Sequence, residues 1–218
     1  VVLPTTLWPN YGIVQDREYP QWDYGYHPEM IKAFKEKHGY DPREQEDPSK
    51  DEKWLKFRCD MVSEVANLVA EVVHKNGKVM SASPFPTPKM AARMVRQYWG
   101  DWNLDIVFPM VYHNFYTEDV SFVADCTIEN ARDKQDMTTL GAGVWAYNTP
   151  EMFATMDAAF NNGAQAISMF TAEEIKDPAI RKQFKEYADS ARAARKANGG
   201  VVKATYPKVA DPDPFKKE

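Results

Sequence analysis

The chain has 218 residues, 44% of them hydrophobic, which is enough to bury a sizeable core in one domain or a large part of one. The formal net charge of −5 is modest, and lysine and arginine are spread along the chain, so neither a nucleic-acid-binding nor a membrane-attracting surface is predicted. No apolar run approaches the ~18 residues of a membrane span. Cys59 and Cys126 fall inside helical patterns, where we expect small buried side chains rather than a disulfide.

The first 27 residues predict a long irregular segment, with proline and glycine as breakers and six aromatic rings. Loops of this length are uncommon in compact domains and usually functional, although the rings could also simply pack on one another. Pro28 and Gly39 then bracket a predicted helix over 29–38. Ser49 followed by Glu52 predicts a capping box that opens a long helix to about residue 76. Its apolar residues recur every three or four positions, so we expect it to pack against something large.

From residue 78 onwards, strand patterns alternate with helix patterns. We predict strands at 78–83, 104–111, 139–147 and 164–170, and helices at 89–99, 120–132, 149–160 and from 178 to about 198. Short connections between such units indicate a parallel sheet. The domain is expected to span residues 1–205, and the proline-rich, charged residues 206–218 are expected to be an extended tail.

Four strands in roughly 140 residues match the density of a (β/α)8 TIM barrel, which needs about 250 residues. The predicted fold class is therefore α/β, of TIM-barrel type, with only the carboxyl-terminal half, about four βα units, present. An open doubly wound sheet is the structural alternative. No glycine-rich strand-to-helix turn of the dinucleotide-binding type supports that alternative.

Three segments of the chain resemble a known family. The segment Trp99–Tyr112 has the pattern Trp-x-x-Trp-x-x-Asp-x-x-x-Pro-Met-x-Tyr, and upstream of it lie Ser-Ala-Ser-Pro-Phe-Pro at 81–86 and Trp-Leu-Lys-Phe-Arg at 54–58. Together they resemble the glycosyl-hydrolase-like family 10 barrels, the DUF187 group, over most of residues 28–170. The resemblance implies a bacterial, periplasmic or secreted barrel that acts on glycans, with peptidoglycan-type chains as one substrate class.

One motif of that family has no counterpart here. Family members carry Asp-Tyr-x-Arg-Tyr-Pro at the end of the fourth strand, and its aspartate and arginine are natural candidates for the chemistry. If the resemblance holds, Val1 begins just after that motif. A half barrel exposes two sheet edges, so we expect it to need the amino-terminal half of the barrel or another chain as a partner.

Glycoside hydrolysis needs two carboxyl groups, one protonated and one ionised. The catalytic candidates are Asp16 and Glu18 in the first loop and Glu173 after the fourth strand. Thr171-Ala-Glu-Glu174 also reads as a capping box, which is an ordinary structural role for the second glutamate. Asp105, at the opposite end of its strand, is predicted to stabilise the fold.

Polar and aromatic side chains follow the predicted strands at the ends where parallel α/β folds bind ligands. The expected carbohydrate-binding residues are Phe85, Tyr112, His113, Tyr116, Trp145 and Tyr147. Rings there offer flat apolar platforms with polar tips, although large aromatics are also common in cores. His113 has no second histidine or cysteine at ligand spacing, so we expect neither a metal site nor a cofactor.

Three functions remain open from the sequence. The first is a glycoside hydrolase acting through a carboxylate acid/base mechanism on a polysaccharide or peptidoglycan-type glycan. The second is a non-catalytic carbohydrate-binding barrel or pseudoenzyme. The third is a structural fragment with no ligand.

Overall fold

A computed structural model describes residues 25–116, 118–146 and 149–197. Its centre is a four-stranded parallel sheet in the order β1-β2-β3-β4, formed by β1 (Ser81–Ala82), β2 (Ile106–Val107), β3 (Thr139–Trp145) and β4 (Ala166–Phe170). Ser81 pairs with Ile106, Ile106 with Thr139, and Gly141 with Ala166. Because sequential strands are neighbours and all run parallel, the carboxyl ends of all four strands meet at one edge of the sheet.

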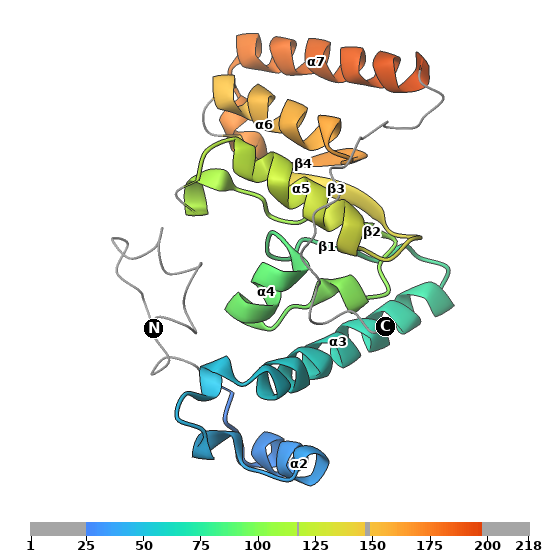
Figure 1. Ribbon diagram of the computed structural model, residues 1–218. Coiled ribbons are helices and arrows are strands. Elements are labelled where there is room, and N and C mark those ends of the chain that lie inside the picture. The colour runs from blue at the N-terminus through green and yellow to red at the C-terminus, as the bar shows by residue number, and fades with distance from the viewer. Residues whose placement is uncertain (1–24, 117, 147–148, 198–218) are drawn as a thin grey trace.

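A helix follows each strand, and the first three of these helices return the chain to the start of the next strand. These helices are α4 (Pro88–Val95), α5 (Ser121–Asp133), α6 (Thr149–Asn161) and α7 (Pro178–Ala197). Before the sheet come α2 (Pro28–His38) and α3 (Glu52–Lys75). In Figure 1 the helices α3 to α7 follow one another from bottom to top in chain order beside the strands.

Alternate residues of the strands pack against these helices. Leu140, Ala142 and Val144 of β3 are each no more than 1% exposed, and residues of α5 and α6 such as Val123 and Met152 complete their surroundings. A strand directs successive side chains to opposite faces, so one face of the sheet is covered by helices. We call the other face, toward which Gly141, Gly143 and Trp145 are directed, the open face.

Local signals explain where the helices begin. Thr87 accepts a hydrogen bond from the backbone nitrogen of Met90 at the start of α4, and Asp177 accepts one from Ala179 at the start of α7. The start of α3 differs from the prediction. Asp51, not Ser49, is the N-cap, because its carboxylate accepts hydrogen bonds from the backbone nitrogens of Lys53 and Trp54. Ser49 lies in the short 3₁₀ helix Pro48–Lys50 instead.

The alternation of strands and helices predicted from the sequence is confirmed, and the fold is α/β with a parallel sheet. Strand lengths were overestimated. The second strand stops at Val107, and Pro109 has no amide hydrogen for the ladder. Beyond it come an isolated bridge from Met110 to Gly143 and single hydrogen bonds such as the one that Met110 N donates to the carbonyl of Pro84. The helix expected to reach residue 99 ends at Val95, since Arg96 takes the left-handed conformation.

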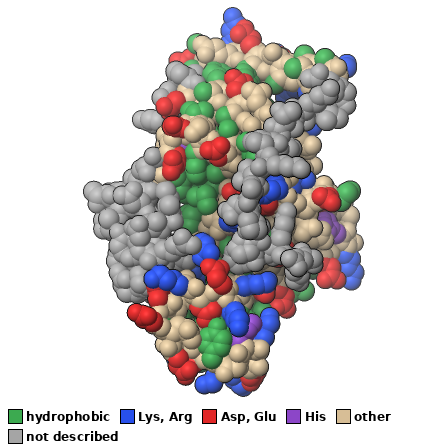
Figure 2. Space-filling view, in the orientation of Figure 1, with side chains coloured by type: hydrophobic (Ala, Val, Ile, Leu, Met, Phe, Trp, Pro, Cys, Tyr) green, Lys and Arg blue, Asp and Glu red, His purple; other side chains and the backbone are tan. Residues whose placement is uncertain are grey.

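Both cysteines are buried free thiols, as predicted from their helical positions. Burial raises the pKa of the Cys59 thiol to about 11, so at neutral pH it is protonated and unreactive. None of the helices in the described residues is long and apolar enough to cross a membrane. Acidic and basic side chains are interspersed on the face shown in Figure 2.

Helix α3 departs from the expectation of a fully covered apolar stripe. Trp54, Leu55 and Cys59 are buried against α2 and α4 as predicted. A second set of its apolar side chains is exposed to solvent, at positions 61, 65, 68, 69 and 72. The helix is therefore apolar on two sides but covered on only one.

Candidate functional site

Four aromatic rings meet where β2, β3 and β4 end. Tyr112 and Phe115 follow β2, Trp145 ends β3, and Phe170 ends β4. The rings of Tyr112 and Phe170 are stacked, with centroids 5.4 Å apart and planes at 27°. Trp145 lies 5.7 Å from Phe170 and 4.8 Å from Phe115, the latter edge-on at 80°. We call these four residues the ring cluster, and none of the described α-helices contributes to it.

No side chain projects from two positions of β3 on the open face, because these positions are the glycines Gly141 and Gly143. A Cβ on Gly141 would lie 2.3 Å from Cδ1 of Phe108, so the Phe108 ring occupies the space that a side chain there would need. A Cβ on Gly143 would lie 3.0 Å from the carbonyl oxygen of Pro109 and 3.5 Å from Cε1 of Tyr112. The glycines thus let the segment after β2 and its rings lie directly on β3.

The ring cluster is only partly covered. Phe170 is 46% exposed, and Ser168, which precedes it on the same side of β4, is exposed as well. Tyr112 and Trp145 are partly exposed. Burial raises the pKa of the Tyr112 phenol, so the group is neutral at physiological pH and can donate a hydrogen bond. The cluster therefore offers aromatic faces and at least one polar tip to a ligand on the open face.

His113 lies beside this cluster but is almost completely buried, at 2% exposure. Neither ring nitrogen has a hydrogen-bond partner among the described residues. Of the described carboxylates, that of Glu151 in the first turn of α6 approaches it, with Oε2 3.6 Å from Nε2 of His113. A buried imidazole without a hydrogen bond is costly, so this residue is the most strongly unsatisfied polar group near the strand ends.

The acidic residues around His113 come from two elements. Glu151 reaches it from α6, and Asp119, which precedes α5, is close enough that His113 contributes to lowering the pKa of the Asp119 carboxyl. The larger cause of that lowering is the hydrogen bonding of Asp119 to Ser121. A rearrangement of less than 1 Å would bring His113 and Glu151 into hydrogen-bond contact, which is the arrangement that proton transfer between them requires.

The predicted catalytic carboxylates are not assembled by the described residues. Glu173 is exposed and forms an ion pair with Lys176. It lies in a short 3₁₀ helix, where its backbone nitrogen donates a hydrogen bond to the hydroxyl of the capping residue Thr171. Asp16 and Glu18 lie outside the described residues. Glu151, which sequence reasoning did not single out, is the described carboxylate that approaches the strand-end histidine. Its position directly after Thr149 and Pro150, at the start of the helix that follows β3, is the signal that could have found it.

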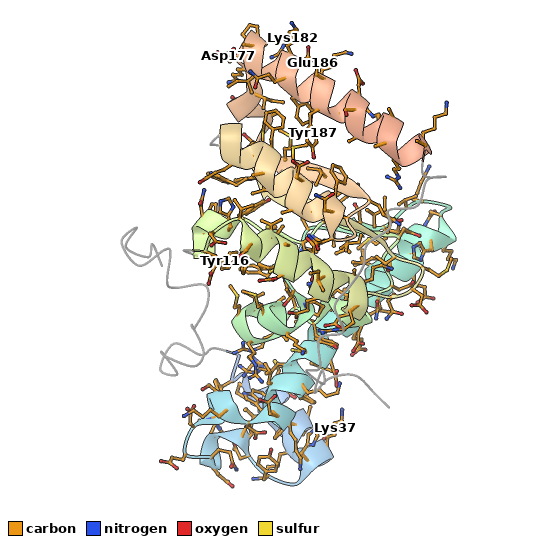
Figure 3. The ribbon with its side chains drawn as sticks, turned by 45° about the horizontal axis from the view of Figure 1, so that its top comes forward. Lys37, Tyr116, Asp177, Lys182, Glu186 and Tyr187 are labelled. Atoms are coloured by element: carbon orange, nitrogen blue, oxygen red, sulfur yellow. The ribbon has the colours of Figure 1, made fainter. Side chains whose placement is uncertain are left out.

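The other predicted binding residues do not all lie together. Tyr112 and Trp145 belong to the ring cluster, and Tyr147 lies outside the described residues. Tyr116 is 5% exposed and packs on Phe122, and burial raises the pKa of its phenol well above the ordinary range. It is a core residue at the edge of α5 (Figure 3).

Phe85, the remaining predicted residue, lies apart from the other rings. It packs against the cluster formed by Trp99, Trp102 and Leu104, and its carbonyl accepts a hydrogen bond from Nε1 of Trp99. The carboxyl end of β1 therefore does not contribute a ring to the cluster, while Phe115 and Phe170 do. Their position at the strand ends is the sequence signal for these two residues.

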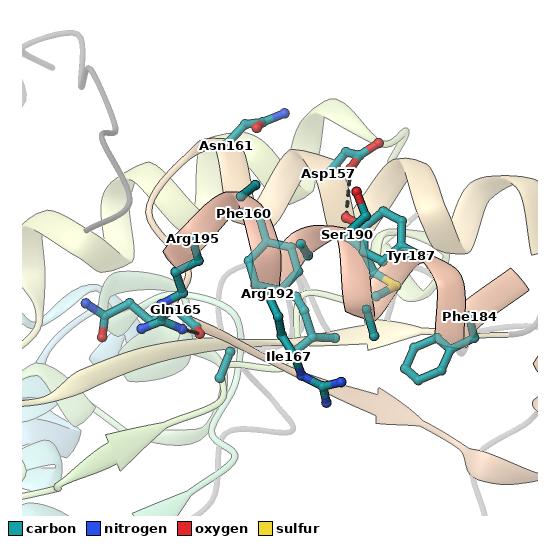
Figure 4. A pocket seen from close by; sticks show the side chains of 15 residues that line it. Asp157, Phe160, Asn161, Gln165, Ile167, Phe184, Tyr187, Ser190, Arg192 and Arg195 are labelled. Carbon is teal, nitrogen blue, oxygen red and sulfur yellow. Dashed lines mark hydrogen bonds between the residues drawn. The ribbon is translucent and has the colours of Figure 1, made fainter. Parts of the chain in front are cut away.

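A cavity among the described residues lies elsewhere. A space of about 650 Å³ lies between α6, α7 and the first residues of β4 (Figure 4). Phe160, Ile167 and Phe184 form its apolar walls, and the hydroxyl of Tyr187 donates a hydrogen bond to Asp157 at 2.7 Å. Ala166 begins β4, so the cavity lies toward the amino end of that strand rather than at the ring cluster. Helix α7, which forms one side of it, has no fully buried residue.

No three histidine, cysteine or acidic side chains converge in a metal-binding arrangement within residues 25–116, 118–146 and 149–197. The site is thus defined by rings, one buried histidine and one nearby carboxylate. Comparison of the chain with protein-family models, with curated proteins and with solved structures gives no match.

Proposed function

We propose that the ring cluster binds the ring faces of a carbohydrate and that the chain belongs to a glycoside hydrolase acting on a polysaccharide or peptidoglycan-type glycan. The observation that carries the proposal is the meeting of Tyr112, Trp145 and Phe170 at the carboxyl ends of three adjacent parallel strands. Sugars present C–H faces that stack on such rings and hydroxyls that pair with polar tips. The sequence resemblance to the glycosyl-hydrolase-like barrels supports the same ligand class, and with it a periplasmic or secreted location.

The finer fold assignment is part of this proposal. The four parallel βα units would be half of a (β/α)8 barrel, with the open face of the sheet lining its interior. In such barrels, small and large side chains alternate in the interior, and ligands bind at the carboxyl ends of the strands. The glycines of β3 under Phe108 and Tyr112 fit an interior packed in this way.

His113 is the residue we assign to proton transfer. It is buried at the ligand end, its ring nitrogens have no hydrogen-bond partner in the described part of the chain, and Glu151 lies just beyond hydrogen-bond distance. Closing that gap would pair the imidazole with a carboxylate, as general acid–base catalysis requires. Members of the family that the sequence resembles carry a further carboxylate in their Asp-Tyr-x-Arg-Tyr-Pro motif, and a group of that kind would complete the acid/base pair of a glycosidase.

Oligosaccharide binding tests the proposal that the ring cluster binds carbohydrate. The chain would be titrated with chitin and peptidoglycan oligosaccharides and binding followed by isothermal titration calorimetry. Trp145→Ala is expected to weaken binding about tenfold, since loss of the ring removes both the apolar area it buries and a stacking contact of on the order of 1 kcal/mol. Tyr112→Phe keeps the ring and should lose much less than Tyr112→Ala. Tyr187→Phe, on α7 and away from the ring cluster, is the control and should leave binding unchanged. Equal binding by all variants would contradict the proposal.

Turnover of glycan strands tests the proposed role of His113 in proton transfer. The release of reducing ends from glycan strands would be measured for the parent chain and for His113→Gln, which keeps the size of the side chain but cannot carry a proton. We expect a loss of turnover with binding retained.

A second function is favoured by the position of Glu173, which points into an ion pair on the surface rather than toward the ring cluster. With no pair of carboxylates brought together by the described residues, the chain could bind glycans without hydrolysing them. Oligosaccharide binding that depends on Trp145, without any release of reducing ends, would identify it as a non-catalytic carbohydrate-binding protein.

A further inference from the structure

Two of the described helices end in the same asparagine–glycine pair. Asn76 and Gly77 follow the last residue of α3, and Asn162 and Gly163 follow the last residue of α6. Both glycines have a positive φ, 65° for Gly77 and 112° for Gly163, which suits a chain that leaves a helix through the left-handed region. A third pair, at 198–199, lies outside the described residues.

The hydrogen bonds around the two described pairs are nearly the same. The side-chain nitrogen of Asn76 donates to the carbonyl of Val72 at 2.8 Å, and that of Asn162 donates to the carbonyl of Ala158 at 2.8 Å. In both cases the residue after the glycine donates its backbone N–H to the carbonyl five positions earlier, at 3.1 Å after α3 and 3.0 Å after α6. The two helix ends are therefore a matched pair within one chain.

The two ends differ at the nitrogen of the glycine. The nitrogen of Gly77 donates a hydrogen bond to the carbonyl of His74 at 2.8 Å. The nitrogen of Gly163 donates none to any residue that the structure describes. Gly163 and Asn162 are both partly exposed, so solvent reaches this turn. The Gly163 nitrogen is therefore available for reaction, whereas the Gly77 nitrogen is held.

The reaction open to such a nitrogen is attack on the side-chain amide that precedes it. Solvent base removes the proton of the Gly163 nitrogen, which then forms a bond to Cγ of Asn162. The bond from Cγ to Nδ2 breaks, and Nδ2 leaves as ammonia with a proton from water, so that a cyclic succinimide remains. Water opens this ring at either carbonyl carbon and gives aspartate or isoaspartate. Glycine favours the first step because no Cβ shields its nitrogen.

We propose that Asn162 is a modification site that deamidates through the nitrogen of Gly163, and that the hydrogen bond from Gly77 to His74 protects Asn76. That bond must break before the Gly77 nitrogen can attack. A hydrogen bond of this kind contributes about 1 kcal/mol, which corresponds to a reaction about fivefold slower. Exposure has the opposite effect, because Asn76 is exposed and Asn162 only partly so. The ratio of the two rates shows which effect is larger.

Conversion of Asn162 changes the joint between α6 and β4. Aspartate or isoaspartate places a negative charge at the carboxyl end of α6, where the helix dipole disfavours it, and removes the side-chain donor that caps the helix. Isoaspartate also adds a methylene group to the main chain just before the buried Ala164 and before Gln165, whose nitrogen donates to the carbonyl of Leu140 at 2.6 Å. Arg195 of α7 donates to the carbonyl of Gln165 in the same place (Figure 4). The modification therefore loosens the start of β4.

Ageing of the purified chain tests the inference. The folded protein would be incubated at mildly alkaline pH, and the peptides that contain residues 76 and 162 would be quantified over time by mass spectrometry. Isoaspartate would be measured by enzymatic methylation. We expect residue 162 to convert about fivefold faster than residue 76. In the same chain unfolded in urea the two rates should agree within about twofold, because the Gly77 hydrogen bond is then absent.

Two matched variants connect the modification to stability. Asn162→Gln removes the reactive site, since the longer side chain closes the corresponding larger ring far more slowly, and Asn76→Gln is the control at the other helix end. We expect the melting temperature of the fully aged parent and of aged Asn76→Gln to fall by about 2–4 °C. The melting temperature of aged Asn162→Gln should stay the same.

The rates in the parent chain can overturn the inference without any variant. Conversion at residue 76 that is as fast as at residue 162 in the folded chain would contradict it. The same ratio of rates in urea would also contradict it, because the neighbouring sequence rather than the fold would then set the difference. An equal fall of the melting temperature in aged Asn162→Gln would show that the modification does not weaken the joint. The inference does not involve the ring cluster, so the glycan-binding result for Trp145→Ala leaves it unaffected.

Discussion

The two faces of the sheet use the same strands in opposite ways. On the helix-covered face, Leu140, Ala142 and Val144 of β3 are essentially inaccessible to solvent. On the open face, the alternate positions of the same strand are Gly141, Gly143 and Trp145. The covered face is filled by branched side chains that meet helices, whereas the open face is filled by rings that arrive from the neighbouring strands. The first arrangement stabilises the fold, and the second leaves aromatic surface available to a ligand or to further strands.

The largest difference between the faces is expected for Leu140→Ala. Leu140 is 1% exposed and packs with Val107 and Trp102, so truncation leaves a cavity that the surrounding helices cannot readily fill. We expect the free energy of unfolding to fall by about 2–5 kcal/mol. Urea unfolding followed by circular dichroism would measure this loss. A loss below about 1 kcal/mol would show that the covered face is loosely packed.

Gly141→Ala tests whether the open face is tightly packed as well. The added methyl group would overlap the Phe108 ring, which must then move off β3. We expect a destabilisation of about 1–3 kcal/mol, as is typical of overpacking. The double variant Gly141→Ala/Phe108→Leu, which trims the ring, should recover part of it. If Gly141→Ala alone costs nothing, the Phe108 ring is free to move and the open face is not packed.

Sequence reasoning recovered the order of the elements because hydrophobic period and turn residues determine it locally. It placed strands near residues 106, 140 and 167. It also ended α2 correctly before Gly39 and started α7 correctly after Asp177. It overestimated β1 and β2, where prolines at 84 and 109 remove ladder donors. The capping of α3 by Asp51 rather than Ser49 was missed, since several polar residues in that turn satisfy the same pattern.

The candidate site was recovered only in part, for a different reason. Tyr112 and Trp145 were identified because they end strands, but strand-end position alone cannot distinguish an exposed ring from a buried one. Tyr116 and His113 lie one to four residues after Tyr112 and are buried, because the short 3₁₀ helix His113–Tyr116 turns them inward. Which side chains a turn buries depends on tertiary contacts that a single sequence does not display.

Phe170→Ala provides a smaller test on the open face. Phe170 is 46% exposed, so its removal gives up less burial than the loss of a core side chain, and we expect a destabilisation below about 1 kcal/mol. The ratio of this loss to that of Leu140→Ala measures the contrast between the two faces directly. Comparable losses would mean that Phe170 is covered in solution, as it would be once further strands close over the ring cluster.

The smallest expected effect concerns the amino end of the sheet, where the contrast between the faces no longer applies. Asp105 precedes β2, and its carboxylate accepts hydrogen bonds from the backbone nitrogen of Met80 at 2.7 Å and lies 2.8 Å from Nε2 of His74. These two contacts, the first being the larger, lower the pKa of Asp105 below its usual range. A carboxyl group whose pKa is lower in the folded state stabilises the fold at neutral pH, and this stabilisation is lost as the pH falls below about 4.

Asp105→Asn should therefore lower the melting temperature slightly at pH 7, because an amide accepts the Met80 hydrogen bond less well than a carboxylate does. The difference from the parent chain should shrink as the pH falls through the region in which Asp105 becomes protonated. Asp125→Asn, an exposed carboxylate on α5, is the control and should shift neither curve. A difference between Asp105→Asn and the parent that stays constant from pH 7 to about pH 3 would show that the carboxylate charge does not hold the end of α3 to the start of β2.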